Sequence, residues 1–163
     1  MQRLLYLILG APDSGRREIV RDIMSEGLRG DACGLALTPE EVPQEPDFAT
    51  WRWKNDAFRL PDEAAAPEVS HLFLILSPAL DLADQIEAAL VLLASQDDLA
   101  LGRILLVVHC GLLKDASPAL QSWHDACAHF ADVVLLARRE GIDNHVVKDF
   151  EKRYRAKRHP SLF

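Results

Sequence analysis

Short apolar runs alternate with longer amphipathic segments along this chain, and this alternation constrains its fold more than any other feature. From residue 71 onward the predicted order is strand, helix, strand, helix, strand, helix. These elements are predicted at 71–76, 82–94, 101–108, 118–130, 133–136 and 144–157. Strands that alternate with helices through short loops form βαβ crossovers, which give a mostly parallel sheet with helices on both faces. The sequence therefore predicts a three-layer α/β fold.

The first part of the chain fits the same fold. A continuous apolar run at 4–9 is typical of a strand that is buried on both faces. A helix is predicted to follow it, with Asp13 or Ser14 as its N-terminal cap and Gly27 and Gly30 at its end. A further short strand is predicted at 33–37.

An antiparallel hairpin is predicted at about 50–60. Two short segments of alternating character flank Asn55 and Asp56, which suit a two-residue turn. This turn places Trp53 opposite Phe58. The other side of the hairpin then carries basic side chains, namely Arg52, Lys54 and Arg59. The alternative is a loop that alternates by chance.

Composition narrows the class of protein. Hydrophobic residues make up 49% and charged residues 26% of the 163 residues, which is typical of one globular domain spanning 1–163. The formal net charge of -7 argues against nucleic acid as the main partner. The three cysteines, Cys33, Cys110 and Cys127, lack the spacing of a disulfide framework. Since no apolar run is long enough to cross a bilayer, we expect a cytoplasmic protein with reduced thiols.

A glycine-bounded loop connects the first strand to the first helix. Its sequence, GAPDSGRR at 10–17, places both glycines at the spacing of the phosphate-loop pattern G-x-x-x-x-G-K-[ST]. Glycines let the backbone wrap around an anion, and the helix start directs free N–H groups toward it. The candidate phosphate-binding residues are Gly10, Asp13, Ser14, Gly15, Arg16 and Arg17.

The last two positions of this loop depart from the pattern. Arg16 stands in place of the lysine and keeps its charge, but its planar guanidinium is not an equivalent point charge. Arg17 stands in place of the hydroxyl that would hold magnesium, and a guanidinium has no lone pair for a cation. We therefore expect weak binding of a magnesium nucleotide. The alternative interpretation, a glycine-bounded turn that binds no ligand, has about equal weight.

Three later segments, taken with the phosphate loop, resemble CobW-type metallochaperone GTPases and the wider class of phosphate-loop GTPases. The segment at 75–81 is similar to the stretch that carries the magnesium-holding acid. The segment at 107–110 stands where the family ends a strand in Asp. The segment at 131–140 is similar to the strand that leads into the guanine-reading N-K-x-D motif. The resemblance implies a phosphate-loop NTPase-like fold, with GTP or GDP as the ligand.

The residues that carry chemistry in this family are largely replaced. No carboxylate closes the strands at Leu76 or Val108, so Mg²⁺ lacks its usual organising acid. Ala137 stands in place of the Asn and Arg138 in place of the Lys of the guanine motif, while Glu140 can still accept hydrogen bonds from a base. The candidate base-binding residues are therefore Arg138 and Glu140, and any binding of GTP or GDP is expected to be weak.

Two other kinds of site have less support. His124, Cys127 and His129, with His109 and Cys110 upstream, contain the ligand types of a zinc site, but helical spacing turns His129 away from the other two. A buried cysteine beside surface histidines is the commoner arrangement. No base stands at a diagnostic spacing from Ser14 or Cys110, so a nucleophile-based hydrolase is not favoured.

These observations lead to three hypotheses. The first is a degenerate GTPase-like domain that acts through protein contacts, with its partner surface at 38–60, where an acidic Pro-rich loop and the hairpin fall about where GTPases have their switch segments. The second is a working NTPase in which Arg16 holds phosphates and Glu140 the base, with Asp81 or Asp84 on the metal. The third is a module that binds another anion at Gly15.

Overall fold

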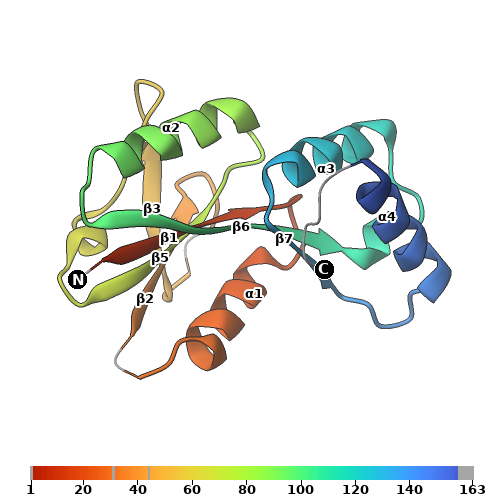
Figure 1. Ribbon diagram of the computed structural model, residues 1–163, viewed down its shortest axis with the longest axis horizontal. Helices are drawn as coiled ribbons and strands as arrows, with labels where there is room; N and C mark the ends of the chain where they lie inside the picture. The colour runs from red at the N-terminus through yellow and green to blue at the C-terminus, as the bar shows by residue number, and fades with distance from the viewer. Residues whose placement is uncertain (1, 31, 44, 158–163) are drawn as a thin grey trace. The chain divides into compact units, whose positions relative to one another are not determined.

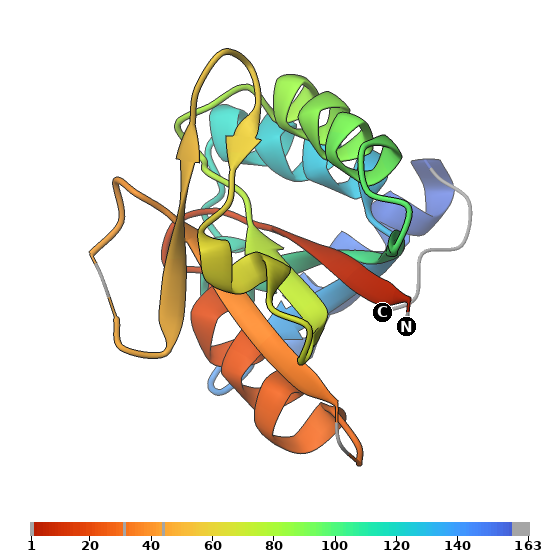
Figure 2. The ribbon, with the colours of Figure 1, turned by 90° about the vertical axis from the view of Figure 1, so that its left-hand side faces the viewer.

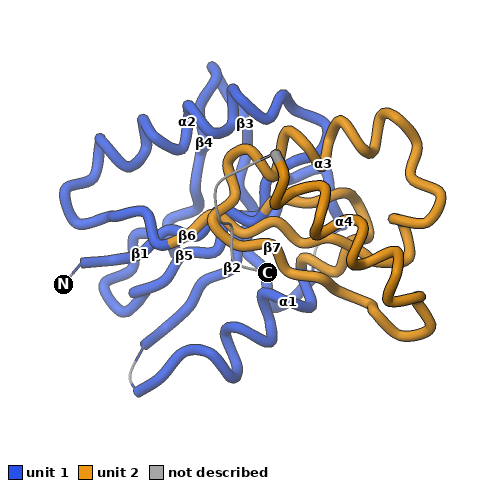
Figure 3. Tube along the Cα trace, turned by 45° about the vertical axis from the view of Figure 1, so that its right-hand side comes forward, with its two compact units in different colours: residues 1–8, 17–102 blue, residues 9–16, 103–163 orange. Residues whose placement is uncertain are grey.

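The computed structural model describes residues 2–30, 32–43 and 45–157 (Figures 1 and 2). The chain divides into two compact units (Figure 3). Unit 1 consists of 1–8 and 17–102, and unit 2 of 9–16 and 103–163. The expectation of one domain over the whole chain stays a prediction.

Unit 1 is built around a mostly parallel sheet. Its strands are β1 (Arg3–Leu9), β2 (Cys33–Pro39), β3 (Phe48–Trp53), β4 (Phe58–Arg59) and β5 (Val69–Ile75), with Leu9 itself falling in unit 2. They lie in the order β4-β3-β2-β5-β1. The pairings of β1 with β5, β5 with β2 and β2 with β3 are parallel, and only β3 with β4 is antiparallel.

Helices cover both faces of this sheet. The first helix, α1 (Arg16–Asp22), continues into a π-helical turn, η1 (Ile23–Gly27), and the second is α2 (Leu82–Ala94). Figures 1 and 2 show α1 and α2 on opposite faces. A short 3-10 turn, η2 (Asp62–Ala65), precedes β5. The predicted α/β class, with a mostly parallel sheet between layers of helices, is confirmed in this unit.

The core of unit 1 comes mainly from β1 and β5, with contributions from β2 and β3. Its most deeply buried side chains include Leu5, Leu7, Ile8, Leu37, Trp51, Leu72, Phe73 and Leu74. Each such side chain contributes about 1.5–3 kcal/mol relative to an exposed position. Both faces of β1 and β5 are therefore occupied, which explains why these strands lack a polar alternation.

The predicted hairpin is present with the expected register. Trp53 pairs with Phe58 and Arg52 with Arg59. Asn55 and Asp56 both have a φ of 53°, as a two-residue turn between twisted antiparallel strands requires. The hairpin prediction is confirmed.

Trp51 does not belong to the surface that we expected at 38–60. Its side chain is 1% exposed, and its indole Nε1 donates to the Ile75 carbonyl at 2.9 Å. The reason is that β3 is not an isolated hairpin strand: it also pairs with β2, so one of its faces lies in the core. Any partner surface of this region therefore excludes Trp51.

Unit 2 contains the remaining strands and helices. They are β6 (Leu99–His109), whose first residues belong to unit 1, a 3-10 turn η3 (Cys110–Leu112), α3 (Pro118–Phe130), β7 (Val133–Ala137) and α4 (Asn144–Lys157). The two strands are parallel, with Leu105 opposite Val133 and His109 opposite Ala137. Ser117 caps α3 by accepting from the Leu120 amide at 3.2 Å.

The expected N-terminal cap of the first helix is wrong for Ser14. The Ser14 hydroxyl has no hydrogen-bond partner among the described residues. Asp13 and Gly15 both have positive φ values, 58° and 90°, so the chain is still turning at Ser14. The helix therefore begins only at Arg16.

Candidate phosphate loop and its surroundings

The predicted phosphate loop forms a tight turn in unit 2. Gly10 and Gly15 have φ values of 146° and 90°, which glycine adopts without strain. Within the turn, the Ser14 amide donates to the Ala11 carbonyl at 3.2 Å. Pro12 and Asp13 are exposed at the crest, while Ser14 and Gly15 are buried. The two glycines of the sequence pattern thus have a backbone reason to be glycine.

Gly10 is closely enclosed. A Cβ atom on this residue would lie 2.5 Å from the Val107 carbonyl oxygen of β6 and 2.8 Å from Ser14 Oγ. The Arg16 Cδ atom would be 3.2 Å away. Because the nearest atom belongs to the backbone, it cannot move aside cheaply. The loop therefore lies directly on β6, and its own side chains pack against its first glycine.

Ser14 contributes a buried hydroxyl that the protein does not satisfy. The residue is 1% exposed, and its Oγ has no hydrogen-bond partner among the described residues. An unsatisfied buried polar group costs about 1–3 kcal/mol. A hydroxyl both donates and accepts, so this atom is suited to an oxygen of a bound anion or to a water molecule.

Cys127 of α3 lies behind the loop as a protonated thiol. Burial raises the pKa of this thiol to about 12, although the charge of Arg16 and the Gly10 amide act in the opposite direction. Burial also raises the pKa of Cys110, with Arg139 opposing it. Neither thiol is poised as a thiolate ligand or nucleophile. In the part of the chain that the structure describes, no three His, Cys, Asp or Glu side chains gather in a metal-binding arrangement.

Arg17 belongs to a different environment from Gly10–Arg16. It lies in unit 1, where its Nη1 donates to Glu45 Oε1 and its Nη2 donates to the Pro43 carbonyl at 3.2 Å. The residue in the position of the magnesium-binding hydroxyl is therefore bound to the acidic loop. Of the six candidate phosphate-binding residues, five belong to unit 2 and Arg17 belongs to unit 1.

The acidic loop is held by its own chain at four points. We call this segment, residues 40–47, the acidic loop. Its contacts are Glu40 with Arg52 Nε at 2.9 Å, Glu41 with the Ser77 hydroxyl, Glu45 with Arg17 and Arg21, and Asp47 with Arg21 Nε at 3.5 Å. The Arg21 guanidinium also lies 4.9 Å from the centre of the Phe48 ring. The sequence predicted an acidic, Pro-rich loop here, and the structure shows that ion pairs fix it, which the sequence pattern does not reveal.

The carboxyl end of β5 carries no acid of its own, as the sequence indicated, but Glu41 of the acidic loop reaches it. The Ser77 hydroxyl donates to Glu41 Oε1, and the Ser77 amide donates to Gln85 Oε1 at 2.8 Å. Asp81, which the second hypothesis assigns to a metal, caps α2 by accepting from the Ala83 amide at 2.8 Å. Sequence reasoning missed Glu41 because its placement depends on the path of a long loop.

The candidate base-binding residues lie at the carboxyl edge of β6 and β7. Arg138 and Glu140 are exposed in the segment that follows β7, and Arg138 has a φ of 52°. His109 ends β6 opposite the end of β7. Its Nδ1 accepts from the Gly111 amide at 2.9 Å, so this nitrogen serves the local turn. Since Gly10 rests on β6 as well, the phosphate loop and the base segment both belong to this pair of strands.

Neither a scan against protein-family models nor a search of curated proteins gives a match for this chain. Among the residues that the structure describes, no helix is both long and apolar enough to cross a membrane.

Proposed function

We propose that this protein is a degenerate phosphate-loop GTPase-like domain, a pseudo-GTPase, that acts mainly through protein contacts and binds nucleotide weakly or not at all. The observation that carries the proposal is the engagement of Arg17 with Glu45 and the Pro43 carbonyl. In a working loop of this pattern, the residue at this position offers a hydroxyl to magnesium. Here the same position holds the acidic loop directly.

The acidic loop falls about where GTPases have a switch segment, and such segments are ordered by the γ-phosphate and its magnesium. In this chain, arginine side chains of α1 hold the acidic loop in place of a γ-phosphate and magnesium. Arg17 and Arg21 both pair with Glu45, and their side chains are only 20% and 39% exposed. A loop that its own protein holds does not need a nucleotide to become ordered.

The exposed face of the hairpin is our candidate partner surface. It carries Arg52, Lys54 and Arg59, and the register places Arg52 directly opposite Arg59. Like charges in directly opposed positions destabilise a strand pair. Arg52 forms an ion pair with Glu40, at 2.9 Å between Nε and Oε1. A basic face kept at this cost on a protein of net charge -7 fits an acidic protein partner.

Calorimetry with GTP, GDP and ATP, with and without Mg²⁺, tests the nucleotide part of the proposal. We expect no magnesium-dependent binding in the micromolar range. The double variant R16K/R17S restores the two missing pattern residues and serves as the comparison. Micromolar magnesium-dependent binding by the unaltered protein would contradict the proposal.

Binding to a polyglutamate peptide tests the partner surface separately. We expect Arg59→Glu to weaken this binding, and more strongly at low salt because the contact is electrostatic. Arg29→Glu is a matched control, since Arg29 is exposed and lies outside the hairpin. Equal weakening by both variants would indicate a general effect of net charge and would exclude the hairpin as a specific surface.

The second candidate, an NTPase that uses Arg16, is favoured by one observation, the unpartnered Ser14 hydroxyl inside the loop. It requires release of phosphate above background that Arg16→Ala abolishes. No release at high protein concentration would exclude it. Asp81→Asn gives a further distinction, because Asn keeps the helix cap but removes the carboxylate that a metal needs. A loss of phosphate release in a variant of unchanged stability would favour a metal role for Asp81.

A further inference from the structure

A groove of about 300 Å³ lies between the hairpin and α2 in unit 1. In Figure 2 these two elements lie side by side. We call this groove the hairpin groove. Its lining comes from the end of the hairpin, from η2 and from the C-terminal part of α2. The lining residues are Phe58, Arg59, Leu60, Ala64, Ala65, Leu92 and Gln96. Because Arg59 also belongs to the basic face of the hairpin, the groove adjoins the candidate partner surface.

The walls of the hairpin groove suit one large apolar side chain. Leu60 and Leu92 are half-buried and Ala65 is exposed, so apolar surface in the groove remains in contact with water. Covering such surface with another apolar group is favourable. An apolar cavity of about 150 Å³ is already large enough for benzene. The groove therefore has room for an aromatic or branched side chain that another molecule presents.

Arg59 brings an unpaired positive charge to the edge of the hairpin groove. The residue is exposed, and its guanidinium has no ion pair or hydrogen bond with any of the described residues. Arg52, directly opposite, is paired with Glu40 instead. The acids of η2, Asp62 and Glu63, are exposed and do not line the groove. A carboxylate that binds beside the groove would therefore meet a guanidinium whose charge is not yet compensated.

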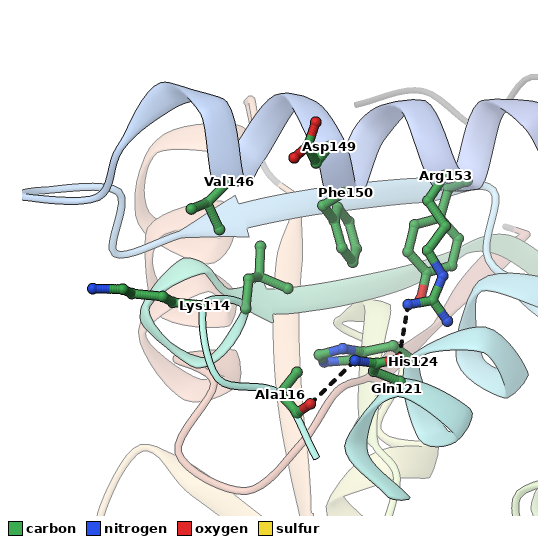
Figure 4. A pocket seen from close by; sticks show the side chains of 10 residues that line it. Lys114, Ala116, Gln121, His124, Val146, Asp149, Phe150 and Arg153 are labelled. Atoms are coloured by element: carbon green, nitrogen blue, oxygen red, sulfur yellow. Dashed lines mark hydrogen bonds between the residues drawn. The ribbon is translucent and has the colours of Figure 1, made fainter. Parts of the chain in front are cut away.

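A groove of about 260 Å³ between α3 and α4 in unit 2 differs from the hairpin groove in its charges. Its arginine is engaged: Arg153 donates to Gln121 at 3.2 Å, as Figure 4 shows, and to Asp125 Oδ2 at 2.8 Å. Lys114 and Asp149, which also line it, carry opposite charges. The hairpin groove is thus the one whose arginine is left for an acidic partner.

The backbone beside the hairpin groove fits an extended peptide. β4 is the last strand of the sheet, and Lys54 and Ala57 exchange backbone hydrogen bonds of 3.1 and 3.3 Å at the turn. Bonded and non-bonded pairs alternate in an antiparallel ladder, so Phe58 directs its amide and carbonyl away from β3, where a peptide strand can add. Neighbouring side chains of such a strand point to opposite faces, one toward the groove and the next toward Arg59.

We propose that the hairpin groove is the docking site for an acidic, extended segment of a protein partner. The segment places one apolar side chain in the groove and an adjacent carboxylate on Arg59. This inference rests on the proposed function, because it uses the basic face of the hairpin as the partner surface, and it adds an apolar anchor to that surface. The charged contact attracts the partner and is weakened by salt, whereas the apolar contact is not screened.

Three labelled peptides of equal length separate the two contacts: EEEFEEE, EEEAEEE and QQQFQQQ. Fluorescence anisotropy measures the binding of each peptide to the full chain at low salt. We expect EEEFEEE to bind about tenfold more tightly than EEEAEEE, because its phenylalanine buries apolar surface in the groove. QQQFQQQ should bind more weakly than EEEFEEE, because it offers no carboxylate to Arg59.

Variants assign each contact to its residues. Ala65 is exposed and lines the groove, so Ala65→Trp fills the groove from outside the core. This variant should bind EEEFEEE and EEEAEEE equally. Ala94→Trp, at an exposed alanine of α2 that does not line the groove, is the matched control and should keep the preference for EEEFEEE. Arg59→Glu should weaken the binding of both acidic peptides more than that of QQQFQQQ. A denaturation curve for each variant shows whether it is folded.

Some results would overturn the groove and leave the basic partner surface standing. They are equal affinity of the unaltered protein for EEEFEEE and EEEAEEE, and a preference for EEEFEEE that persists in a folded Ala65→Trp variant. Equal affinity for QQQFQQQ and EEEFEEE would overturn the contact with Arg59. If neither acidic peptide binds, both this inference and the basic partner surface are wrong, while the proposed weak binding of nucleotide is unaffected.

Discussion

The acidic loop of unit 1 and the phosphate loop of unit 2 differ in how their polar groups are satisfied. Every carboxylate of the acidic loop, namely Glu40, Glu41, Glu45 and Asp47, has a partner from the same chain. Unit 2 holds buried side-chain atoms without a partner, including Ser14 Oγ, Trp123 Nε1 and His124 Nε2, whereas the described residues of unit 1 hold none. The acidic loop therefore has its carboxylates paired, whereas the phosphate loop has a buried hydroxyl without a partner among the described residues.

This difference shows which segment has its polar groups paired within the chain and which has a buried polar group that a ligand would pair with. A satisfied network such as that of the acidic loop fixes a conformation. An unsatisfied buried atom destabilises the fold until something pairs with it. The acidic loop thus has the properties of a segment held by its own chain, while unit 2 contains buried polar atoms that a bound group would stabilise.

We expect the largest effect on stability from Gly10→Ala, which strains the backbone of the phosphate loop. The new Cβ would meet the Val107 carbonyl oxygen at 2.5 Å, in a backbone conformation of φ 146°. The free energy of unfolding should fall by about 3 kcal/mol, as for a strained backbone combined with a clash. Urea denaturation measures this change.

Gly141→Ala is the matched control for Gly10. Gly141 also lies in unit 2 and has a positive φ of 70°, but nothing lies within 4 Å of its Cβ position. We expect a loss of only about 1 kcal/mol there, because the backbone conformation is the sole cost. Similar losses for both variants would show that the contact with β6 is not what fixes the phosphate loop.

Glu45→Gln tests the acidic loop, and we expect an intermediate effect on stability. It weakens the pairs with Arg17 and Arg21, which are partly exposed and so contribute about 0.5–1 kcal/mol in total. Amide hydrogen exchange should become faster in the acidic loop and remain unchanged in unit 2. Glu68→Gln, an exposed residue outside the loop, is the control. Unchanged exchange in the loop would mean that the prolines alone hold it.

The smallest effect is a dependence of stability on pH that comes from His124. Burial lowers the pKa of His124 in the folded protein, so below about pH 6.5 the unfolded chain binds a proton that the folded chain does not. Stability should therefore decrease as the pH falls from about 6.5 toward the folded pKa. His124→Phe should reduce this slope, which denaturation curves at pH 7.5, 6.5 and 5.5 measure. An unchanged slope would place the proton uptake elsewhere.

The sequence predicted the elements well because their signals are local. The apolar run at 4–9 and the turn at Asn55 and Asp56 each depend on residues within one element, and both were found. The parallel pairing of β3 with β2 was not predicted, because 38–48 read as a loop with no sheet partner. That pairing is what buries Trp51 and removes it from the surface.

The site was less predictable because it depends on contacts between distant segments. The spacing of Gly10 and Gly15 correctly indicated positions of unusual backbone conformation. The contacts of Arg17 with Glu45 and of Arg3 with Asp98 join residues that are 28 and 95 positions apart. No periodicity or local motif encodes such pairs. His124 was considered as a metal ligand, and its burial between two helices became visible only when α4 was placed against α3.

Because Cys127 is buried, its rate of labelling by a thiol reagent measures how often unit 2 opens. A thiol reagent reacts with the thiolate, and this thiol is both enclosed and protonated near neutral pH. Cys33 of unit 1 is exposed and should be labelled at once. The delay between the two labelling events would then report how often the region behind the phosphate loop opens, and a compound that occupies that loop should lengthen the delay.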